Sequence, residues 1–177
     1  MITDFIKKNN VPEELIKEYT GMLPAEFISF WREYGFGTFY NGYLKSINPK
    51  DYKDILEQSY FQGGVAVPVF ATAFGDLIVW EKNQFIGIVK YRYGENDIIS
   101  DGADFFFDDL LDGEFDNVFF SIKKYLEAIK KIGKLEYDEC FGYVPLLLLG
   151  GKETVDHIKK VKIREHITLI SEMAGGI

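Results

Sequence analysis

The chain has 177 residues, of which 47% are hydrophobic and 16% aromatic, so it is long and apolar enough to form a sizeable folded core. Its 20 basic and 28 acidic side chains give a formal net charge of −8, which argues against direct binding of nucleic acid, because phosphates require a cationic surface. The single cysteine, Cys140, excludes an internal disulfide and a cysteine-based zinc cluster. The sequence lacks a signal-peptide pattern and an apolar run long enough to span a bilayer, so we expect a cytoplasmic protein with no membrane contact.

Two short helices are predicted at the start of the chain. Thr3 is placed to cap a helix over residues 4–8, and Pro12 is placed to open a helix over residues 13–19. The second of these helices has three apolar or aromatic residues on one face, which we expect to be buried: Leu15, Ile16 and Tyr19.

The segment from residue 23 to residue 52 carries the densest structural signals. Pro24 suits the first position of a helix, and Gly35 and Gly37 end that helix because glycine adopts positive φ angles without steric cost. Between them, aromatic residues recur at spacings of three and four and therefore share one helix face. This stripe predicts a structural nucleus instead of a chemical site, and its members are Phe27, Phe30, Trp31 and Tyr34.

Strands are predicted from residue 38 onward. Short strands over residues 38–40 and 43–47 precede Asn48, which is placed to cap another helix. Three β-branched and aromatic runs over residues 65–93, separated by turn residues, predict an antiparallel meander, and residues 96–100 suggest a fourth strand. Pro68 predicts an edge or a bulge, because proline cannot donate a ladder hydrogen bond. We expect one face of this sheet to be well buried and the other to be partly covered by helices.

The C-terminal part is predicted to be mainly helical. Residues 103–115 fit either a helical turn or an extended segment across the sheet. The remaining elements are a long amphipathic helix from about residue 117 to Gly133, a buried extended segment over 141–151, a helix starting near Glu153 and a last helix over 164–173. The whole chain, residues 1–177, is predicted to form one compact α+β unit with N-terminal helices, a central, mostly antiparallel twisted sheet and C-terminal helices.

A search of the sequence for catalytic or metal-binding patterns finds only weak candidates. His157 and His166 are nine residues apart, which is not the i, i+4 spacing that a helix uses to bind zinc, and we expect both to be partly exposed helix residues. Cys140 is expected to be an incidental thiol. We therefore predict no catalytic residue, cofactor or metal, and keep as the alternative a small-molecule enzyme that uses one of these three side chains.

The negative charge is concentrated in one segment. Nine acidic residues and no Lys or Arg lie between Glu95 and Asp116, whereas the rest of the chain is close to neutral. The acids are mixed with Phe and Leu, a composition that suits a desolvated contact with a basic protein more than a fully solvated face. The predicted partner-binding residues are Asp101, Asp104, Asp108, Asp109, Asp112, Glu114 and Asp116.

Two stretches resemble a known family. Residues 23–56 resemble the N-terminal segment of the GAD-like domain, and the matching positions are Trp31, Tyr34, Gly35, Gly37, Gly42, Asn48, Pro49 and Tyr52. Residues 141–175 are similar to the C-terminal segment of the same proteins, through Phe141, Gly142, Tyr143, Pro145, Gly150, Gly151, the step from Lys160 to Lys162, Glu165 and His166. The resemblance implies a GAD-like part over residues 1–100 and an immunity-type part over 101–177, packed on each other.

The resemblance also implies a function. Proteins with these two parts resemble the immunity proteins of type VI secretion DNase effectors and, more distantly, the SUKH immunity proteins, which share an α+β fold. We therefore expect a protein that is not an enzyme and that neutralises a cognate bacterial toxin, whose basic nuclease domain is the implied partner. The oligomeric state is left open, and a SUKH-like regulatory or scaffold module remains a further alternative.

Overall fold

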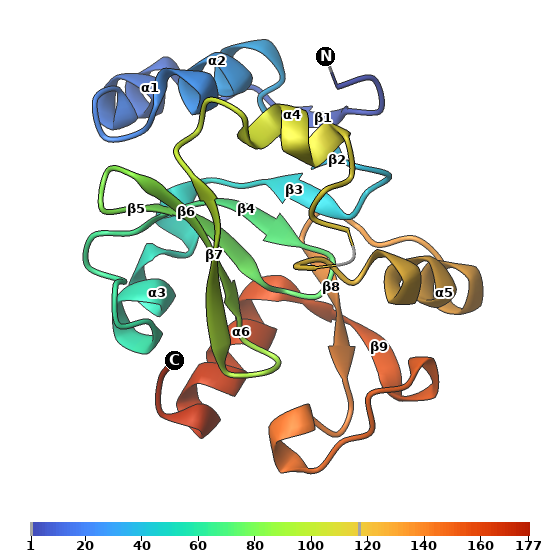
Figure 1. Cartoon of the computed structure of the whole chain (residues 1–177). Helices are drawn as coiled ribbons and strands as arrows, with labels where there is room; N and C mark the ends of the chain where they lie inside the picture. The colour runs from blue at the N-terminus through green and yellow to red at the C-terminus, as the bar shows by residue number, and fades with distance from the viewer. Residues whose placement is uncertain (1, 117) are drawn as a thin grey trace.

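The computed structural model describes residues 2–116 and 118–177, and it has the predicted α+β fold (Figure 1). The described helices are α1 (Glu13–Tyr19), α2 (Ala25–Glu33), α3 (Lys53–Ser59), α4 (Phe106–Leu111), α5 (Ile122–Ile132) and α6 (Ile163–Ala174). The described strands are β1 (Ile6–Asn9), β2 (Phe36–Phe39), β3 (Leu44–Ser46), β4 (Val67–Thr72), β5 (Leu77–Glu81), β6 (Phe85–Lys90), β7 (Glu95–Asp101), β8 (Glu139–Tyr143) and β9 (Ile158–Lys162).

The strands form a seven-stranded sheet in chain order, β1 to β7, in which each strand is antiparallel to the next, and a separate hairpin of β8 and β9. The predicted meander is therefore confirmed as β4 to β6, its suggested fourth strand is β7, and β1 to β3 extend the sheet on the other side. Pro68 lies in β4, an interior strand, and the pairing with β5 shifts register between Pro68 and Phe70. Of the two positions predicted for this proline, the bulge is the one observed.

The helix predicted over residues 4–8 is wrong, because residues Ile6–Asn9 form strand β1 and pair with β2. Five residues are too few to offset the cost of starting an isolated helix, whereas β2 offers a free edge with backbone hydrogen-bonding groups. Next to Thr3, the carboxylate of Asp4 accepts hydrogen bonds from the backbone N–H groups of Tyr40 (3.3 Å) and Asn41 (2.5 Å), in the turn after β2.

Two boundaries in the C-terminal part also differ from the predictions. Helix α5 begins at Ile122, later than predicted, and residue 117 itself lies outside the described residues. Near Glu153 there is no helix start among the described residues, and a 3₁₀ turn over Val155–His157 leads into strand β9. Pairing with β8 explains the difference, because the strand places Ile158 opposite Tyr143 and buries both side chains.

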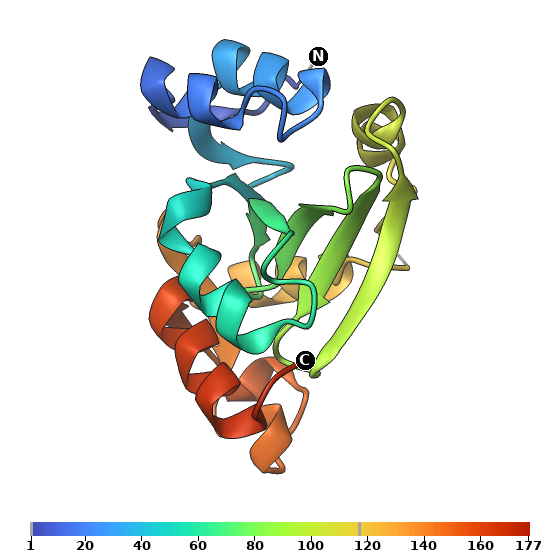
Figure 2. The same ribbon diagram turned by 90° about the vertical axis from the view of Figure 1, so that its left-hand side faces the viewer.

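The central strands are buried on both faces, which corrects the expectation that one face would be only partly covered. Every residue of β4 and of β5 is buried. One hydrophobic cluster joins the sheet to α2 and α4, and the other joins it to α3 and α6 (Figure 2). Each cluster contains residues that are far apart in the sequence, such as Phe27 with Phe141 and Leu56 with Ile167.

Candidate functional site

Helix α4 fixes the acidic segment on the protein surface. From the sequence, residues 103–115 fit either a helical turn or an extended segment. In the structure, Phe106–Leu111 form a helix. Phe106 and Leu110 are fully buried, and the Phe106 ring stacks 5.6 Å from the ring of Phe115 and 6.2 Å from that of Phe70. These apolar anchors hold the helix against the sheet, so the acidic side chains between them face solvent.

The seven predicted partner-binding acids lie along one continuous stretch from the end of β7 through α4 to the loop that follows it (Figure 1). Five are exposed: Asp101, Asp104, Asp108, Asp112 and Glu114. Asp109 and Asp116 are half-buried. None of the seven forms a salt bridge with a Lys, Arg or His in the part of the chain that the structure describes. Their negative charge is therefore not neutralised within the described molecule.

Two of these seven residues have contacts inside the protein. The hydroxyl of Tyr40 donates a hydrogen bond of 2.5 Å to Asp116, and burial together with this carboxylate raises the pKa of Tyr40. The side-chain amide of Gln84 donates a hydrogen bond of 3.0 Å to Asp101. Asp116 and Asp101 therefore help to hold the two ends of the acidic segment in place.

Apolar side chains are also exposed beside these acids. Phe105 is 70% exposed and Leu111 is 44% exposed, immediately before α4 and at its last residue. The sequence mixes Phe and Leu through this segment, but a six-residue helix is too short for periodicity to show which of them face inward. Only the structure separates the buried Phe106 and Leu110 from the exposed pair.

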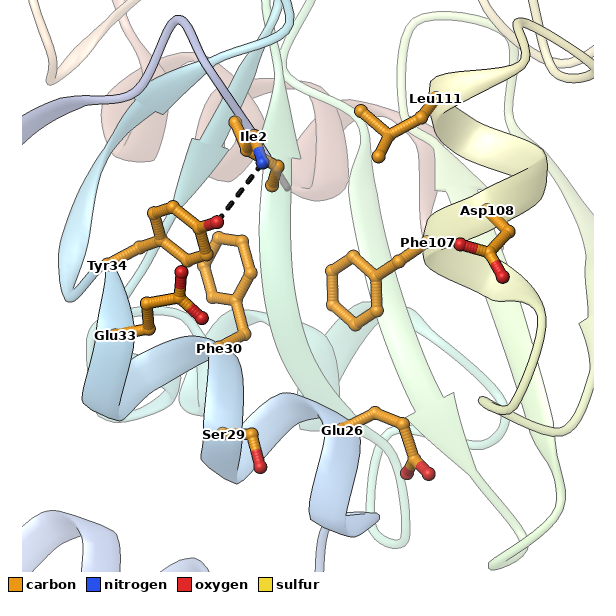
Figure 3. A pocket seen from close by; sticks show the side chains of 9 residues that line it. All are labelled: Ile2, Glu26, Ser29, Phe30, Glu33, Tyr34, Phe107, Asp108 and Leu111. Carbon is orange, nitrogen blue, oxygen red and sulfur yellow. Dashed lines mark hydrogen bonds between the residues drawn. The ribbon is translucent and has the colours of Figure 1, made fainter.

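A groove of about 240 Å³ lies between α2 and α4 (Figure 3). Phe30, Tyr34 and Phe107 point into it, and carboxylates of both helices lie at its border. The acids that α2 contributes, Glu26 and Glu33, could not be predicted from the sequence, because no local pattern links them to a helix that follows more than 70 residues later. The residues that line the groove are Ile2, Glu26, Ser29, Phe30, Glu33, Tyr34, Phe107, Asp108 and Leu111.

The three side chains kept for the enzyme alternative are not arranged as a nucleophile and base. Cys140 is completely buried, and burial raises the pKa of its thiol, so the reactive thiolate is disfavoured. His166 is only 7% exposed, which corrects the prediction of a partly exposed residue, and burial lowers its pKa. His157 lies in the 3₁₀ turn, where its Nδ1 is 2.8 Å from the hydroxyl of Thr154. Within the described residues, no hydrogen bond joins Cys140 to either histidine.

Two other kinds of feature are absent from residues 2–116 and 118–177. In these ranges no three His, Cys, Asp or Glu side chains are grouped so that they could hold a metal ion. No helix in the same ranges has the length and apolar character needed to cross a membrane.

Comparison with known proteins identifies the family. Residues 1–91, just over half of the chain, match the family model of the GAD-like domain. The chain belongs to the GAD-like domain family. Residues 100–174 of this GAD-like protein match a second family model, described as T6SS immunity protein Tdi1, C-terminal. Both matches confirm the resemblance that the sequence motifs predicted.

The fold of the GAD-like protein is also shared by a solved structure. The crystal structure of Atu4351 from Agrobacterium tumefaciens is similar with a TM-score of 0.75 and 19% sequence identity, over 95% of this chain and 85% of that chain. At this identity the likeness concerns the fold. No curated protein has a significantly similar sequence.

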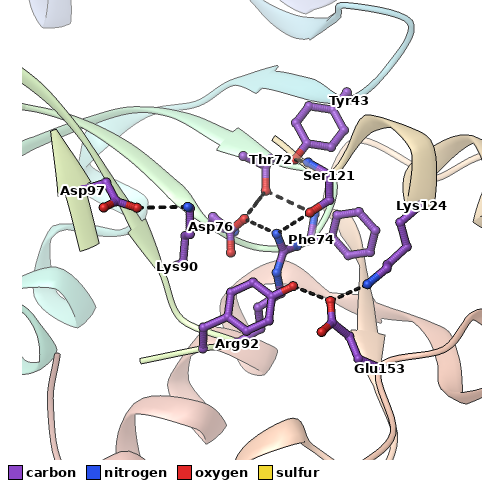
Figure 4. A network of polar contacts seen from close by, with 11 residues as sticks. Tyr43, Thr72, Phe74, Asp76, Lys90, Arg92, Asp97, Ser121, Lys124 and Glu153 are labelled. Atoms are coloured by element: carbon purple, nitrogen blue, oxygen red, sulfur yellow. Dashed lines mark hydrogen bonds and ion pairs between the residues drawn. The ribbon is translucent and has the colours of Figure 1, made fainter. Parts of the chain in front are cut away.

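Arg92 connects the two matched segments of the GAD-like protein through an ion pair with the first and a hydrogen bond with the second. Arg92 lies between them in the sequence, and its Nη2 is 3.2 Å from Oδ2 of Asp76 in the first segment and 3.1 Å from the hydroxyl of Ser121 in the second (Figure 4). Burial raises the pKa of Asp76, while the charge of Arg92 and the hydroxyl of Thr72 oppose that rise. The guanidinium also lies 4.4 Å from the ring centre of Phe74. Sequence reasoning missed this pair, because isolated charges within strands show no pattern of partners.

A second group of polar contacts extends this network to the surface. The hydroxyl of Tyr93 donates a hydrogen bond of 2.5 Å to Glu153, and Lys124 of α5 forms a salt bridge with the same carboxylate (Figure 4). The pKa of Glu153 is lowered, because these two partners outweigh the opposing effect of its partial burial. These contacts position α5 and the loop before β9 relative to the sheet.

Proposed function

We propose that this GAD-like protein is an immunity protein that binds and neutralises a cognate bacterial toxin in the cytoplasm. The observation that carries the proposal is the acidic surface from Asp101 to Asp116, which has no salt-bridge partner in the described part of the chain and lies within the segment similar to the T6SS immunity protein model. The proposed toxin is a type VI secretion effector or a related effector with a nuclease domain.

The charge of the surface favours a nuclease as the target. A nuclease binds phosphates through a cationic surface, and exposed carboxylates offer the same sign of charge as the nucleic acid backbone. Complementary charges speed the encounter of two proteins and select the partner, whereas exposed apolar groups supply the area buried on contact. Phe105 and Leu111 provide such groups beside the acids. In this proposal the protein covers the basic surface of the toxin and does not itself bind nucleic acid.

The first experiment tests whether the toxin exists. We expect the gene next to that of this chain to encode a large protein with a secretion module and a nuclease-like C-terminal domain. A catalytically inactive form of that domain should co-purify with this protein, and this protein should protect cells that produce the active domain. Failure of the two products to associate would overturn the proposed function.

The second experiment tests the acidic surface. Asp104→Lys/Asp112→Lys reverses two exposed charges that have no hydrogen-bonded partner among the described side chains, and it should weaken toxin binding at least about tenfold and reduce its dependence on salt. Glu172→Lys on α6, at the other end of the molecule, is the matched control and should bind like the wild type (Figure 1). Equal affinity and equal salt dependence of all three proteins would place the interface elsewhere.

A further inference from the structure

The groove between α2 and α4 has an aromatic floor. The rings of Phe30 and Phe107 come from opposite helices and stack with their centroids 5.4 Å apart and their planes 12° from parallel. Tyr34 continues the floor, with its ring centroid 5.1 Å from that of Phe30, and its hydroxyl accepts a hydrogen bond of 3.1 Å from the backbone N–H of Ile2 (Figure 3). These contacts fix the rings before any partner arrives, so little conformational freedom is lost on binding.

The border of the groove is acidic. Glu26 and Glu33 belong to α2 and Asp108 belongs to α4, and none of the three pairs with a cation in the part of the chain that the structure describes. The neighbouring Arg32 is directed elsewhere, since its Nη2 is 3.3 Å from Oε1 of Glu13 on α1. Three carboxylates attract a cation through their charge, and the half-buried rings of Tyr34 and Phe107 attract it through their negative faces. Phe30 is buried beneath them and supports Phe107.

The size of the groove favours a single side chain. Its volume of about 240 Å³ is below the range of about 300 to 1,000 Å³ that is usual for small-molecule pockets. Arginine suits this shape better than lysine, because its planar guanidinium stacks on aromatic rings and donates paired hydrogen bonds to a carboxylate. Leu111 at the border, 44% exposed, can pack on the aliphatic part of the same side chain.

We propose that this groove receives an arginine side chain from the basic surface of the toxin. The inference rests on the proposed function and makes it more specific: α2 of the GAD-like segment and α4 of the immunity-type segment contact the toxin together. Asp108 belongs both to the groove and to the acidic surface, so the two form one continuous binding face.

A titration of the free protein tests the groove without the toxin. N-acetyl-L-arginine amide is added to ¹⁵N-labelled protein, and saturable chemical-shift changes are expected at the backbone amides of α2 and α4. The lysine and norleucine amides serve as controls and should produce smaller changes at these positions. Equal changes with norleucine, or changes spread over all exposed acids, would overturn the proposal. Shifts at the groove that depend on protein concentration without any added amide would assign it to a second copy of the chain and would also overturn it.

A binding measurement tests the groove with the inactive toxin domain. Glu26→Gln/Asp108→Asn removes two charges with little change in shape, and it should weaken binding at least about tenfold, as expected for an anchoring contact. Glu172→Gln is the matched control, and thermal unfolding checks that all variants are folded. If this variant binds like the wild type while Asp104→Lys/Asp112→Lys binds more weakly, only the groove is overturned. If the wild type binds no toxin, the proposed function itself fails.

Discussion

Asp76 and Arg92 form an ion pair inside the protein, with their side chains 0% and 4% exposed. Taking two charges out of water is unfavourable, and such a pair persists only where hydrogen bonds and packing compensate. Here Thr72 donates a hydrogen bond of 3.2 Å to Asp76, and Ser121 and the ring of Phe74 contact Arg92. The pair therefore links β4, the turn before β5 and the start of α5 into one unit.

Removing one partner of this pair should be strongly destabilising. Asp76→Ala leaves the Arg92 guanidinium buried without its counter-charge, and we expect the free energy of unfolding to fall by about 3 to 5 kcal/mol. The measurement is urea unfolding followed by circular dichroism. Glu13→Ala is the matched control, because both side chains of its pair with Arg32 are 56% exposed, and it should change stability by about 1 kcal/mol or less. Similar effects of the two substitutions would contradict the structural role of the buried pair.

The buried His166 should make stability depend on pH. Burial lowers its pKa below the ordinary value of 6.5, so the unfolded chain binds a proton at a pH where the folded chain does not. The contribution of this residue is fully present above pH 6.5 and is lost as the pH falls from there through the folded pKa. His166→Gln should therefore show a smaller loss of unfolding free energy between pH 7.5 and pH 5.5 than the wild type. His157→Gln, which changes a half-exposed residue, is the control, and a pH response unchanged by His166→Gln would refute the prediction.

The thiol of Cys140 should be inert in the folded protein. It is completely buried, and burial raises its pKa, so both access and ionisation oppose reaction with a disulfide reagent. Native protein mixed with Ellman's reagent should release almost no colour until denaturant is added, and then one equivalent. Ser29→Cys places a thiol on the exposed side of α2 and should react at once. Rapid reaction of the native wild type would show that Cys140 is accessible and would favour the enzyme alternative.

Trp31 should contribute to stability and not to toxin binding. It is 2% exposed, and its ring packs edge-on against Tyr19 at 5.7 Å and against Phe36 at 6.0 Å. Trp31→Ala should lower the free energy of unfolding by about 3 to 5 kcal/mol, while the folded fraction keeps its affinity. Phe61→Ala, at a position 67% exposed, should change stability by about 0.5 kcal/mol or less. Loss of affinity in a Trp31 variant that remains as stable as the wild type would place this residue in the interface.

The sequence predicted the elements whose patterns are long and local. The aromatic stripe of α2 spans more than two turns, and the strands of the meander are separated by clear turn residues, so both were predicted correctly. Strand β1 was missed because only its pairing with β2 decides between strand and helix. The groove was missed for a related reason: Glu33 and Asp108 are far apart in the sequence and line the same groove only in the folded chain.

In the acidic segment, too, the sequence predicts the local property, which is charge, but not the property that depends on tertiary packing, which is the exposure of each side chain. Its charge was readable from composition, and the structure places all seven predicted acids on one stretch, five of them exposed. The sequence could not predict that Phe105 is exposed and its neighbour Phe106 is buried, because tertiary packing against Phe70 and Phe115 sets the direction of the Phe106 ring.

The position of Arg92 has a consequence for how such proteins diversify. Because Arg92 lies just outside the first matched segment, a recombination event that exchanged residues 1–91 alone would place it opposite the residue that the relative has at position 76. An exchange of residues 100–174 would leave the ion pair intact and change only the hydroxyl partner at position 121. Hybrids that keep both charged residues should fold, and hybrids that lose one should need a compensating change at the other. A viable exchange of the first segment therefore depends on inheriting both charges together, whereas the second segment can be exchanged without dividing the ion pair.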